Sequence, residues 1–312
     1  MLHTKTFQNS EGVSGINDSQ NSGSLKFFSP PTINEKVTKS RKSCLDPGKG
    51  TPVILLTRGR TGSTSTWEMI GSLTGKETPD EEYPGSGNDI LKFYEGLDKE
   101  KSRQRGGWVI EKLCEKQKVQ KVLSDDVFGF KYKPYHHVHP QFMAAFESIA
   151  NIKSPLIKIV RLRRNLLDVY LSGFKHKTKT PAHCKKGKKM IECLKLHLQA
   201  GTGMKLSPQS VLNFLRKTTK DEDEVDQMLQ NLGIRHVIVS FENLYYNGQK
   251  TTEWLKIINF LNDGSEHSLP KHKVDSAMRS IATNNPLHNV TIKNYEEIKK
   301  KLEGTEFQHL LH

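Results

Sequence analysis

Short apolar runs alternate along this chain with longer segments in which apolar and polar residues are mixed. The runs predict strands buried on both faces, and they lie at 52–57, 127–131, 155–160 and 236–241. Helical patterns predict helices at 64–73, 140–150, 166–174 and 251–261, and within 90–123, 190–232 and 292–311. Strands that alternate with helices predict an α/β fold of three layers, in which helices flank a central parallel sheet.

The first 50 residues differ in composition from the rest. They are rich in Ser, Asn, Gly and Lys and have almost no periodic apolar pattern, which predicts that 1–50 is a disordered or loosely attached arm. Every predicted strand and helix falls within 51–312, so we expect one domain there. No stretch reaches the roughly 18 to 20 apolar residues of a membrane span, and no signal peptide is recognisable.

The net charge limits the kinds of partner that the protein can bind, and the cysteine content bears on the compartment in which it occurs. The formal net charge of +14 predicts an anionic partner, such as a nucleotide, a nucleic acid, a membrane or a sulfated glycan. Four cysteines without a C-x-x-C spacing are too few for a disulfide scaffold and do not indicate zinc. A reduced, cytoplasmic compartment is the simpler expectation. A Golgi lumen is the alternative if the chain is a trimmed fragment, and Cys184 and Cys193 are then candidates to pair.

The segment after the first predicted strand has the features of a phosphate-binding loop. Its sequence is Arg58-Gly-Arg-Thr-Gly-Ser63, and two more hydroxyl residues follow. Glycines permit a tight turn and a close approach of phosphate, while backbone N–H groups and the helix dipole attract an anion. A Walker A loop requires Lys after its last glycine. Ser63 stands there instead, so a nucleotide kinase or an ATPase is disfavoured.

A second motif follows the third predicted strand. Arg164, Asp168 and Ser172 succeed one another at intervals of four residues. Ser172 lies about two helical turns beyond Arg164, so both side chains can point to one phosphate group. Arg161 and Arg163 flank the motif, and which arginine makes the contact stays open at this point.

Together the two motifs resemble the signatures of the sulfotransferases that use 3′-phosphoadenosine-5′-phosphosulfate (PAPS). Residues 60–64 are similar to the family's 5′-phosphosulfate loop, and 157–172 to its 3′-phosphate signature. Residues 238–244 are similar to a family strand that ends in Tyr-Glu-Asp-Leu, with Phe241 in place of Tyr. The resemblance runs from about residue 52 to the end, and is closer to bacterial trehalose-type and carbohydrate sulfotransferases than to the cytosolic phenol and steroid branch.

The resemblance implies a fold like that of the P-loop nucleoside-triphosphate hydrolases. It also implies transfer of a sulfuryl group from PAPS to a hydroxyl or amine, with adenosine 3′,5′-bisphosphate (PAP) as product and no metal. The acceptor is unidentified; a carbohydrate, a small metabolite and an anionic molecule are candidates. Nucleic acid is not expected, and the oligomeric state stays open. The residues expected to bind PAPS are Arg60, Thr61, Gly62, Ser63, Thr64, Ser65, Arg164, Ser172 and Phe241.

Sulfuryl transfer requires a base for the acceptor and positive charge or hydrogen-bond donors at the leaving phosphate oxygen. Residues 78–84 are similar to a bacterial pattern that carries a glutamate base, and Glu82 occupies the matching position in what we expect to be a loop, 75–87. Lys131 and Arg60 are expected to stabilise the leaving group or the acceptor. Rival candidates for the base are Asp80, Glu81, His136, His137 and His139.

Two other functions are compatible with the sequence. The chain is alternatively a non-enzymatic protein that uses its charge to bind RNA or a sulfated glycan, and strong salt dependence without nucleotide preference would favour this. The basic segment 175–189 suits a clamp for a polyanionic acceptor, part of the entrance for PAPS, or a solvated loop. A P-loop kinase is a third possibility, and it would require magnesium-dependent turnover of ATP.

Overall fold

A computed structural model describes the chain at 44–74, 82–83, 108–123, 126–133, 146–150, 157–177, 203–246, 250–262 and 287–311. Most of the predicted arm, 1–50, lies outside these residues, so its disorder stays a prediction. Its last part, 44–50, contacts the folded domain: the side chain of Leu45 is buried, and a disulfide joins Cys44 to Cys114.

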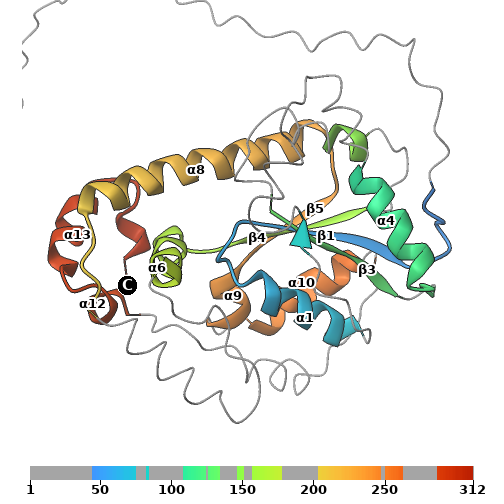
Figure 1. Ribbon diagram of the computed structural model, residues 1–312, viewed down its shortest axis with the longest axis horizontal. Helices are drawn as coiled ribbons and strands as arrows, with labels where there is room; N and C mark the ends of the chain where they lie inside the picture. Colours follow the sequence, from blue (N-terminus) through green and yellow to red (C-terminus); the bar gives the residue numbers. More distant parts are fainter. Residues whose placement is uncertain are drawn as a thin grey trace, which may run out of the picture. The chain divides into compact units, whose positions relative to one another are not determined.

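A parallel sheet forms the centre of the domain (Figure 1). Its five strands follow the spatial order β2-β3-β1-β4-β5, and every neighbouring pair is parallel. The strands are β1 (Thr51–Thr57), β2 (Glu82–Tyr83), β3 (Val127–Tyr132), β4 (Lys158–Arg163) and β5 (His236–Ser240). In a parallel sheet all carboxyl ends lie at one edge, and ligands bind beyond that edge. The segments that follow β1 and β4 are therefore neighbours.

Helices cover both faces of this sheet (Figure 1). One face carries α1 (Ser63–Thr74), α9 (Phe241–Tyr245) and α10 (Lys250–Leu261). The other face carries α4 (Trp108–Val119), the helical residues 146–150 and the second half of α8 (Pro208–Asn231). Beyond the carboxyl edge lies α6 (Leu166–Lys177), followed by the C-terminal elements α12 (His288–Thr291), α13 (Tyr295–Leu302) and the 3₁₀ helix η3 (Gln308–Leu310).

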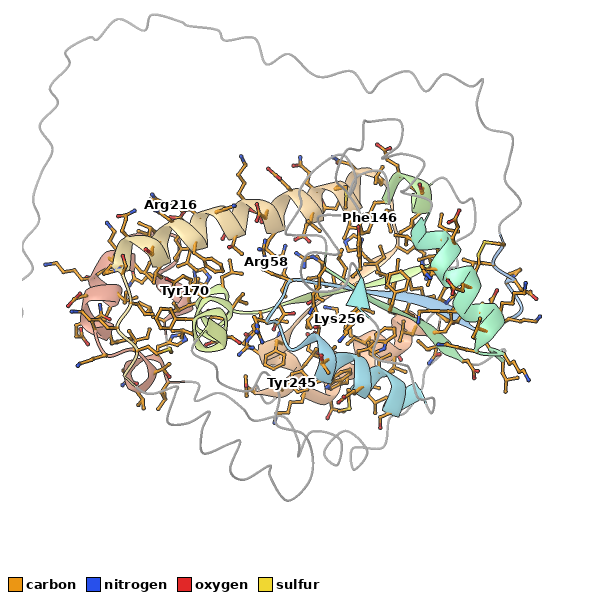
Figure 2. The ribbon with its side chains drawn as sticks, in the orientation of Figure 1. Arg58, Phe146, Tyr170, Arg216, Tyr245 and Lys256 are labelled. Atoms are coloured by element: carbon orange, nitrogen blue, oxygen red, sulfur yellow. A yellow bond between two sulfur atoms is a disulfide. The ribbon has the colours of Figure 1, made fainter. Side chains whose placement is uncertain are left out.

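The alternation of side chains along β1 explains the layering. Val53 and Leu55 pack toward α1, α9 and α10, whereas Ile54 and Leu56 pack toward α4 and α8. Because successive residues of a strand point to opposite faces, a strand apolar at every position must be covered on both sides. A third apolar cluster joins α6, the first half of α8 and the C-terminal elements. In it the ring of Tyr170 packs 5.0 Å from that of Phe214 (Figure 2).

The predicted α/β fold, with a central parallel sheet between two helical layers, is confirmed. Two local predictions were wrong. The third predicted strand corresponds to β4, which extends to Arg163 instead of ending at residue 160. Carboxylates of α8 pair with the arginines at its end. Residues 82–83, predicted to lie in a loop, form β2, which is held by its pairing with β3 and has no apolar pattern of its own. In the described parts of the chain, no helix has the length and apolar character needed to cross a membrane.

Candidate functional site

The turn between β1 and α1 is tight and closed by its own hydroxyl groups. Gly62 has a φ of +81°, and Arg60 has a φ of +72°, which is uncommon for a residue with a side chain. The hydroxyl of Thr61 donates to the carbonyl oxygen of Arg58 over 2.8 Å and also bonds the hydroxyl of Thr57. The loop therefore has a fixed conformation that ends at the first turn of α1, where N–H groups without helical partners point outward.

Gly62 cannot be replaced without disturbing its neighbour Phe241. A Cβ atom at Gly62 would lie 2.2 Å from a carbon of the Phe241 ring. The ring is buried, with 3% of Phe241 exposed, and its centroid lies 4.5 Å from that of Tyr245. Tyr245 in turn shares a hydrogen bond of 3.1 Å with Thr66 of α1 (Figure 2). The ring of Phe241 thus packs against the loop at Gly62.

Arg164, the residue after β4, contacts the same loop. Its Nη1 donates to the carbonyl oxygen of Arg60 over 3.1 Å, and its guanidinium lies 4.6 Å from the centre of the Phe241 ring. The side chain is only 5% exposed. A guanidinium over an aromatic face is a favourable arrangement. The two sequence motifs and the Phe241 segment therefore meet at one place.

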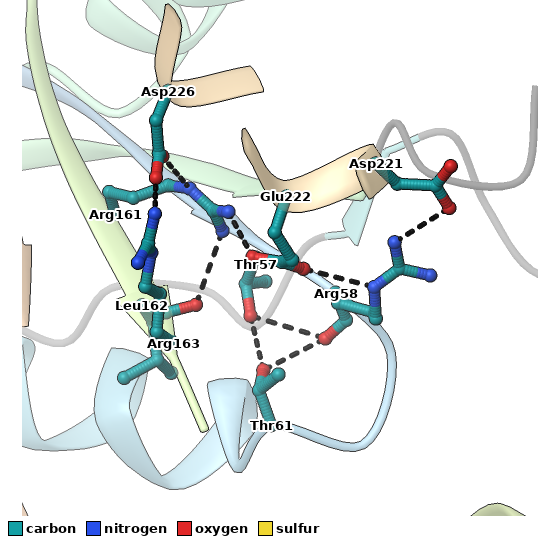
Figure 3. Close-up of polar contacts among 9 residues, drawn as sticks. All are labelled: Thr57, Arg58, Thr61, Arg161, Leu162, Arg163, Asp221, Glu222 and Asp226. Atoms are coloured by element: carbon teal, nitrogen blue, oxygen red, sulfur yellow. Dashed lines mark hydrogen bonds and ion pairs between the residues drawn. The ribbon is translucent and has the colours of Figure 1, made fainter. Parts of the chain in front are cut away.

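The other two arginines considered for this role have different partners. Nε of Arg161 lies 3.0 Å from Oδ1 of Asp226, and Arg161 also pairs with Glu222 (Figure 3). Arg163 pairs with Asp226 as well. Both arginines thereby pair with carboxylates of α8, whereas Arg164 donates a hydrogen bond to the loop.

Arg58, the first residue of the loop, is also held by α8. Its Nε lies 3.0 Å from Oε1 of Glu222, and its Nη2 lies 3.0 Å from Oδ2 of Asp221 (Figure 3). Three arginines and three carboxylates thus form a network over the ends of β1 and β4, in which Arg161 is fully buried and Arg163 is 40% exposed. A largely buried network of this kind is stable only when its charges are matched, and here they balance.

Lys131 lies on the opposite side of the loop from this network. It is the fifth residue of β3, and its Nζ donates to the hydroxyl of Thr64 over 3.0 Å. Only 2% of Lys131 is exposed. The backbone of Glu82 is the register partner of Lys131 in the parallel pairing of β2 with β3. The structure thus places the backbone of Glu82, Lys131 and the first turn of α1 at the same edge of the sheet.

The remaining predicted phosphate ligands differ in position. Ser63 is buried at the start of α1, while Thr64 and Ser65 are partly exposed beside it. Ser172 is partly exposed within α6, and among the described residues no hydrogen bond joins it to the loop. The side chain of Glu82 lies outside the described residues, as do Asp80, Glu81, His136, His137 and His139. Nor does any cluster of three or more His, Cys, Asp or Glu suited to a metal occur in the described ranges.

Sequence reasoning missed Asn165 and its partner Glu242. The side-chain oxygen of Asn165 accepts hydrogen bonds from the N–H groups of Leu167 and Asp168, at 2.9 and 3.4 Å, as an N-cap does. Its own N–H donates to Oε1 of Glu242 over 2.8 Å. Burial raises the pKa of Glu242 above its ordinary value, although this hydrogen bond opposes the shift. An Asn before a helical pattern is a recognisable cap signal. Glu242 lies in the segment 238–244 singled out from the sequence, but its contact with Asn165 has no local signal.

Comparison with known proteins gives little further information. No protein-family model and no curated protein matches this sequence. One solved structure that matches is that of retinol dehydratase in complex with androsterone and the inactive cofactor PAP: 13% identity, 83% of this chain and 67% of that chain covered, TM-score 0.28. A second is retinol dehydratase in a complex with retinol and PAP: 13% identity, 83% of each chain covered, TM-score 0.30. Similarity this low says nothing about what this chain binds or does.

Proposed function

We propose that this protein is a PAPS-dependent sulfotransferase that transfers a sulfuryl group to a hydroxyl or amine of its acceptor. The observation that carries the proposal is the hydrogen bond from Arg164 to the carbonyl oxygen of Arg60. It joins two segments that resemble the 5′ and 3′ signatures of that family. A donor with phosphate groups at both ends requires such a pair of neighbouring sites.

The loop and the first turn of α1 are suited to the 5′-phosphosulfate. Backbone N–H groups from Gly62 to Ser65 and the positive end of the helix dipole attract anionic oxygens. The hydroxyls of Ser63, Thr64 and Ser65 add donors. Arg60 adds a positive charge on a side chain that starts from the same turn. These donors are fixed before the nucleotide binds, which keeps the cost of ordering them low.

Arg164 is suited to the 3′-phosphate. A guanidinium recognises phosphate through two parallel hydrogen bonds, and Arg164 is already oriented by Arg60 and Phe241. Ser172 is assigned to the same phosphate on the family resemblance alone. Phe241 is buried under Arg164, which supports a role in holding the loop and Arg164 in place.

The proposed reaction is a direct displacement at sulfur. Glu82 takes the proton of the acceptor hydroxyl, the acceptor oxygen forms a bond to sulfur, and the bond between sulfur and the 5′-phosphate oxygen breaks. Negative charge then develops on that phosphate oxygen as PAP departs. Lys131, three ångströms from Thr64, is near enough to the loop to stabilise this charge. A base near the operating pH and a fixed cation at the leaving group are what such a step requires.

The disulfide between Cys44 and Cys114 supports an oxidising compartment for this protein. Disulfides are rare in reducing compartments and common in secretory ones. The sequence alone favoured the cytoplasm and suggested a different pair, Cys184 and Cys193, which lies outside the described residues. Of the two compartments considered from the sequence, the Golgi lumen suits this bond better.

Binding of the full chain to a polyanion is the other candidate function, and the net charge of +14 is the observation that favours it. One experiment separates the two. Transfer of radiolabelled sulfate from PAPS is measured against panels of sugars, phenols, sterols and peptides. In parallel, binding of heparin and of RNA is measured at several salt concentrations. Labelled product that depends on the acceptor supports the sulfotransferase. Absence of any labelled product, with salt-dependent polyanion binding that PAP does not compete, supports the alternative.

A further inference from the structure

The C-terminal segment 287–311 is attached to the turn that carries Arg164 at two separate points. The side-chain amide of Asn165 donates to the carbonyl oxygen of Leu310 over 2.9 Å. Three residues further on, Oδ1 of Asp168 lies 3.0 Å from Nε2 of His288. Figure 1 shows that α6 lies between the sheet and these C-terminal elements. Both bonds therefore connect the end of the chain to the first turn of α6.

Asn165 joins more elements than an N-cap requires. Its side-chain oxygen caps α6, its backbone N–H binds Glu242 of α9, and its side-chain amide binds Leu310. These three polar groups of Asn165 thus bind three different elements. Because Asn165 follows Arg164 directly, fixing Asn165 also fixes where the side chain of Arg164 begins.

The side chain of Asp168 lies between Arg164 and the C-terminal segment. Its Oδ2 lies 4.0 Å from Nη2 of Arg164, while its Oδ1 faces His288. His288 is fully buried, so this contact is shielded from water. A carboxylate held on one side by a buried histidine presents its other oxygen to the guanidinium in a restricted orientation.

We infer that the segment 287–311 completes the nucleotide site, and that Asn165 and Asp168 act as positioning residues through which its docking sets the orientation of Arg164. The inference rests on the proposed function. It has a reciprocal consequence, because coupling between two binding events is symmetric: PAP bound to Arg164 must in turn stabilise the docked C-terminal segment. A contact that serves stability alone has no such effect.

The substitutions that test this keep the cap and the charge. Asn165→Ser retains an N-cap oxygen but loses the amide that reaches Leu310. His288→Phe retains a ring and loses the partner of Asp168, whereas His288→Gln keeps a nitrogen donor in its place. Ile257→Val is the control, since Ile257 is buried in α10 within a different apolar cluster. It lowers the unfolding temperature without changing any contact of the C-terminal segment.

Two measurements are made on the full chain: the affinity for PAP by calorimetry, and hydrogen exchange of 287–311 with and without PAP. We expect PAP to slow exchange in this segment of the wild type. Asn165→Ser and His288→Phe should weaken PAP binding about fivefold or more and remove the slowing. His288→Gln should recover part of both, and Ile257→Val should change neither.

The failure of this inference differs from the failure of the proposed function. If the wild type does not bind PAP, the sulfotransferase proposal is wrong. If the wild type binds PAP but exchange in 287–311 is unchanged, or if both site variants bind PAP as tightly as the control, then the C-terminal segment does not position Arg164 and only the inference is overturned.

Discussion

Nη1 of Arg164 lies 3.1 Å from the carbonyl oxygen of Arg60, although 104 positions separate the two residues in the chain. The bond exists because β1 and β4 are neighbours in a parallel sheet, so that the segments after them leave the same edge side by side. Each segment by itself is an ordinary turn. Where they meet, the guanidinium of Arg164 and the N-terminus of α1 lie at the same edge of the sheet.

Replacing Gly62 with alanine should destabilise the protein and abolish nucleotide binding. The new Cβ would meet the ring of Phe241, and the φ of +81° disfavours any side chain. We expect a loss of about 1–3 kcal/mol in the free energy of unfolding, measured by chemical denaturation. Gly173→Ala is the matched control, because open space surrounds Gly173 within α6. The Gly173→Ala variant should be as stable as the wild type or slightly more stable. If Gly62→Ala were equally stable, the close packing of Gly62 against Phe241 would be contradicted.

Glu82→Gln should lower turnover while leaving the affinity for PAP unchanged. Loss of a general base costs about 10²–10⁴ in rate, whereas the isosteric amide disturbs little else. Steady-state kinetics with saturating PAPS, together with calorimetry of PAP binding, measure the two effects separately. Glu81→Gln serves as control and should retain full activity. Equal turnover by Glu82→Gln and wild type would exclude Glu82 and move the base to its rivals, the histidines at 136, 137 and 139 or the neighbouring carboxylates Asp80 and Glu81.

Lys131→Met should reduce kcat more than it weakens PAP binding. The methionine preserves the volume of a side chain that is 2% exposed, but removes the donor to Thr64 and the positive charge. Removing one donor from a developing oxyanion costs about a hundredfold or more in kcat. An equal loss in kcat and in PAP affinity would instead make Lys131 a ground-state ligand of the nucleotide.

Removing the disulfide should lower stability in oxidising buffer only. The bond between Cys44 and Cys114 closes a loop with a sequence separation of 70, for which chain entropy predicts a loss of about 4 kcal/mol. Thermal unfolding of Cys44→Ser, with and without dithiothreitol, measures the effect. Reductant should lower the unfolding temperature of the wild type to that of the variant. A free thiol at both positions in protein purified without reductant would contradict the bond and the oxidising compartment.

The raised pKa of Glu242 predicts a pH dependence of stability. Burial holds the folded pKa above the ordinary 4.5, so the folded state binds the proton more tightly than the unfolded chain does. The free energy of unfolding contributed by this group is therefore complete below pH 4.5 and falls as the pH rises through the folded pKa. Glu242→Gln keeps an oxygen for the N–H of Asn165 and should remove this fall. Denaturation curves recorded between pH 4 and 8 test this, and an unchanged profile would contradict it.

The sequence predicts the local parts of this site well and the long-range parts poorly. The unit of β1, loop and α1 is predictable because apolar runs, glycines and hydroxyls lie within about twenty adjacent residues. The choice among Arg161, Arg163 and Arg164 is not, since it depends on two carboxylates of α8, Glu222 and Asp226, with which Arg161 and Arg163 pair. The end of β4 is hard to predict for the same reason, because charged residues ordinarily mark the end of an apolar strand.

Other features required partners that no local pattern reveals. The short strand β2 is held by pairing with β3, and the bond between Cys44 and Cys114 depends on α4 lying beside the segment before β1. His288 gives no signal in the sequence that it is buried against Asp168. Asn165 is intermediate: its role as an N-cap is predictable from the helix that follows, but its bond to Leu310 is not.

The difference in affinity between PAP and adenosine 5′-monophosphate, in wild type and in Arg164→Ala, tests the central claim most directly. Calorimetry should show that the wild type binds PAP at least about tenfold more tightly, a difference of about 1.4 kcal/mol. Arg164→Ala should remove that preference and leave the monophosphate affinity nearly unchanged, while Arg216→Ala, which removes an exposed charge on α8, should preserve it. Equal affinity of the wild type for both nucleotides, or a preference that survives in Arg164→Ala, would contradict the account.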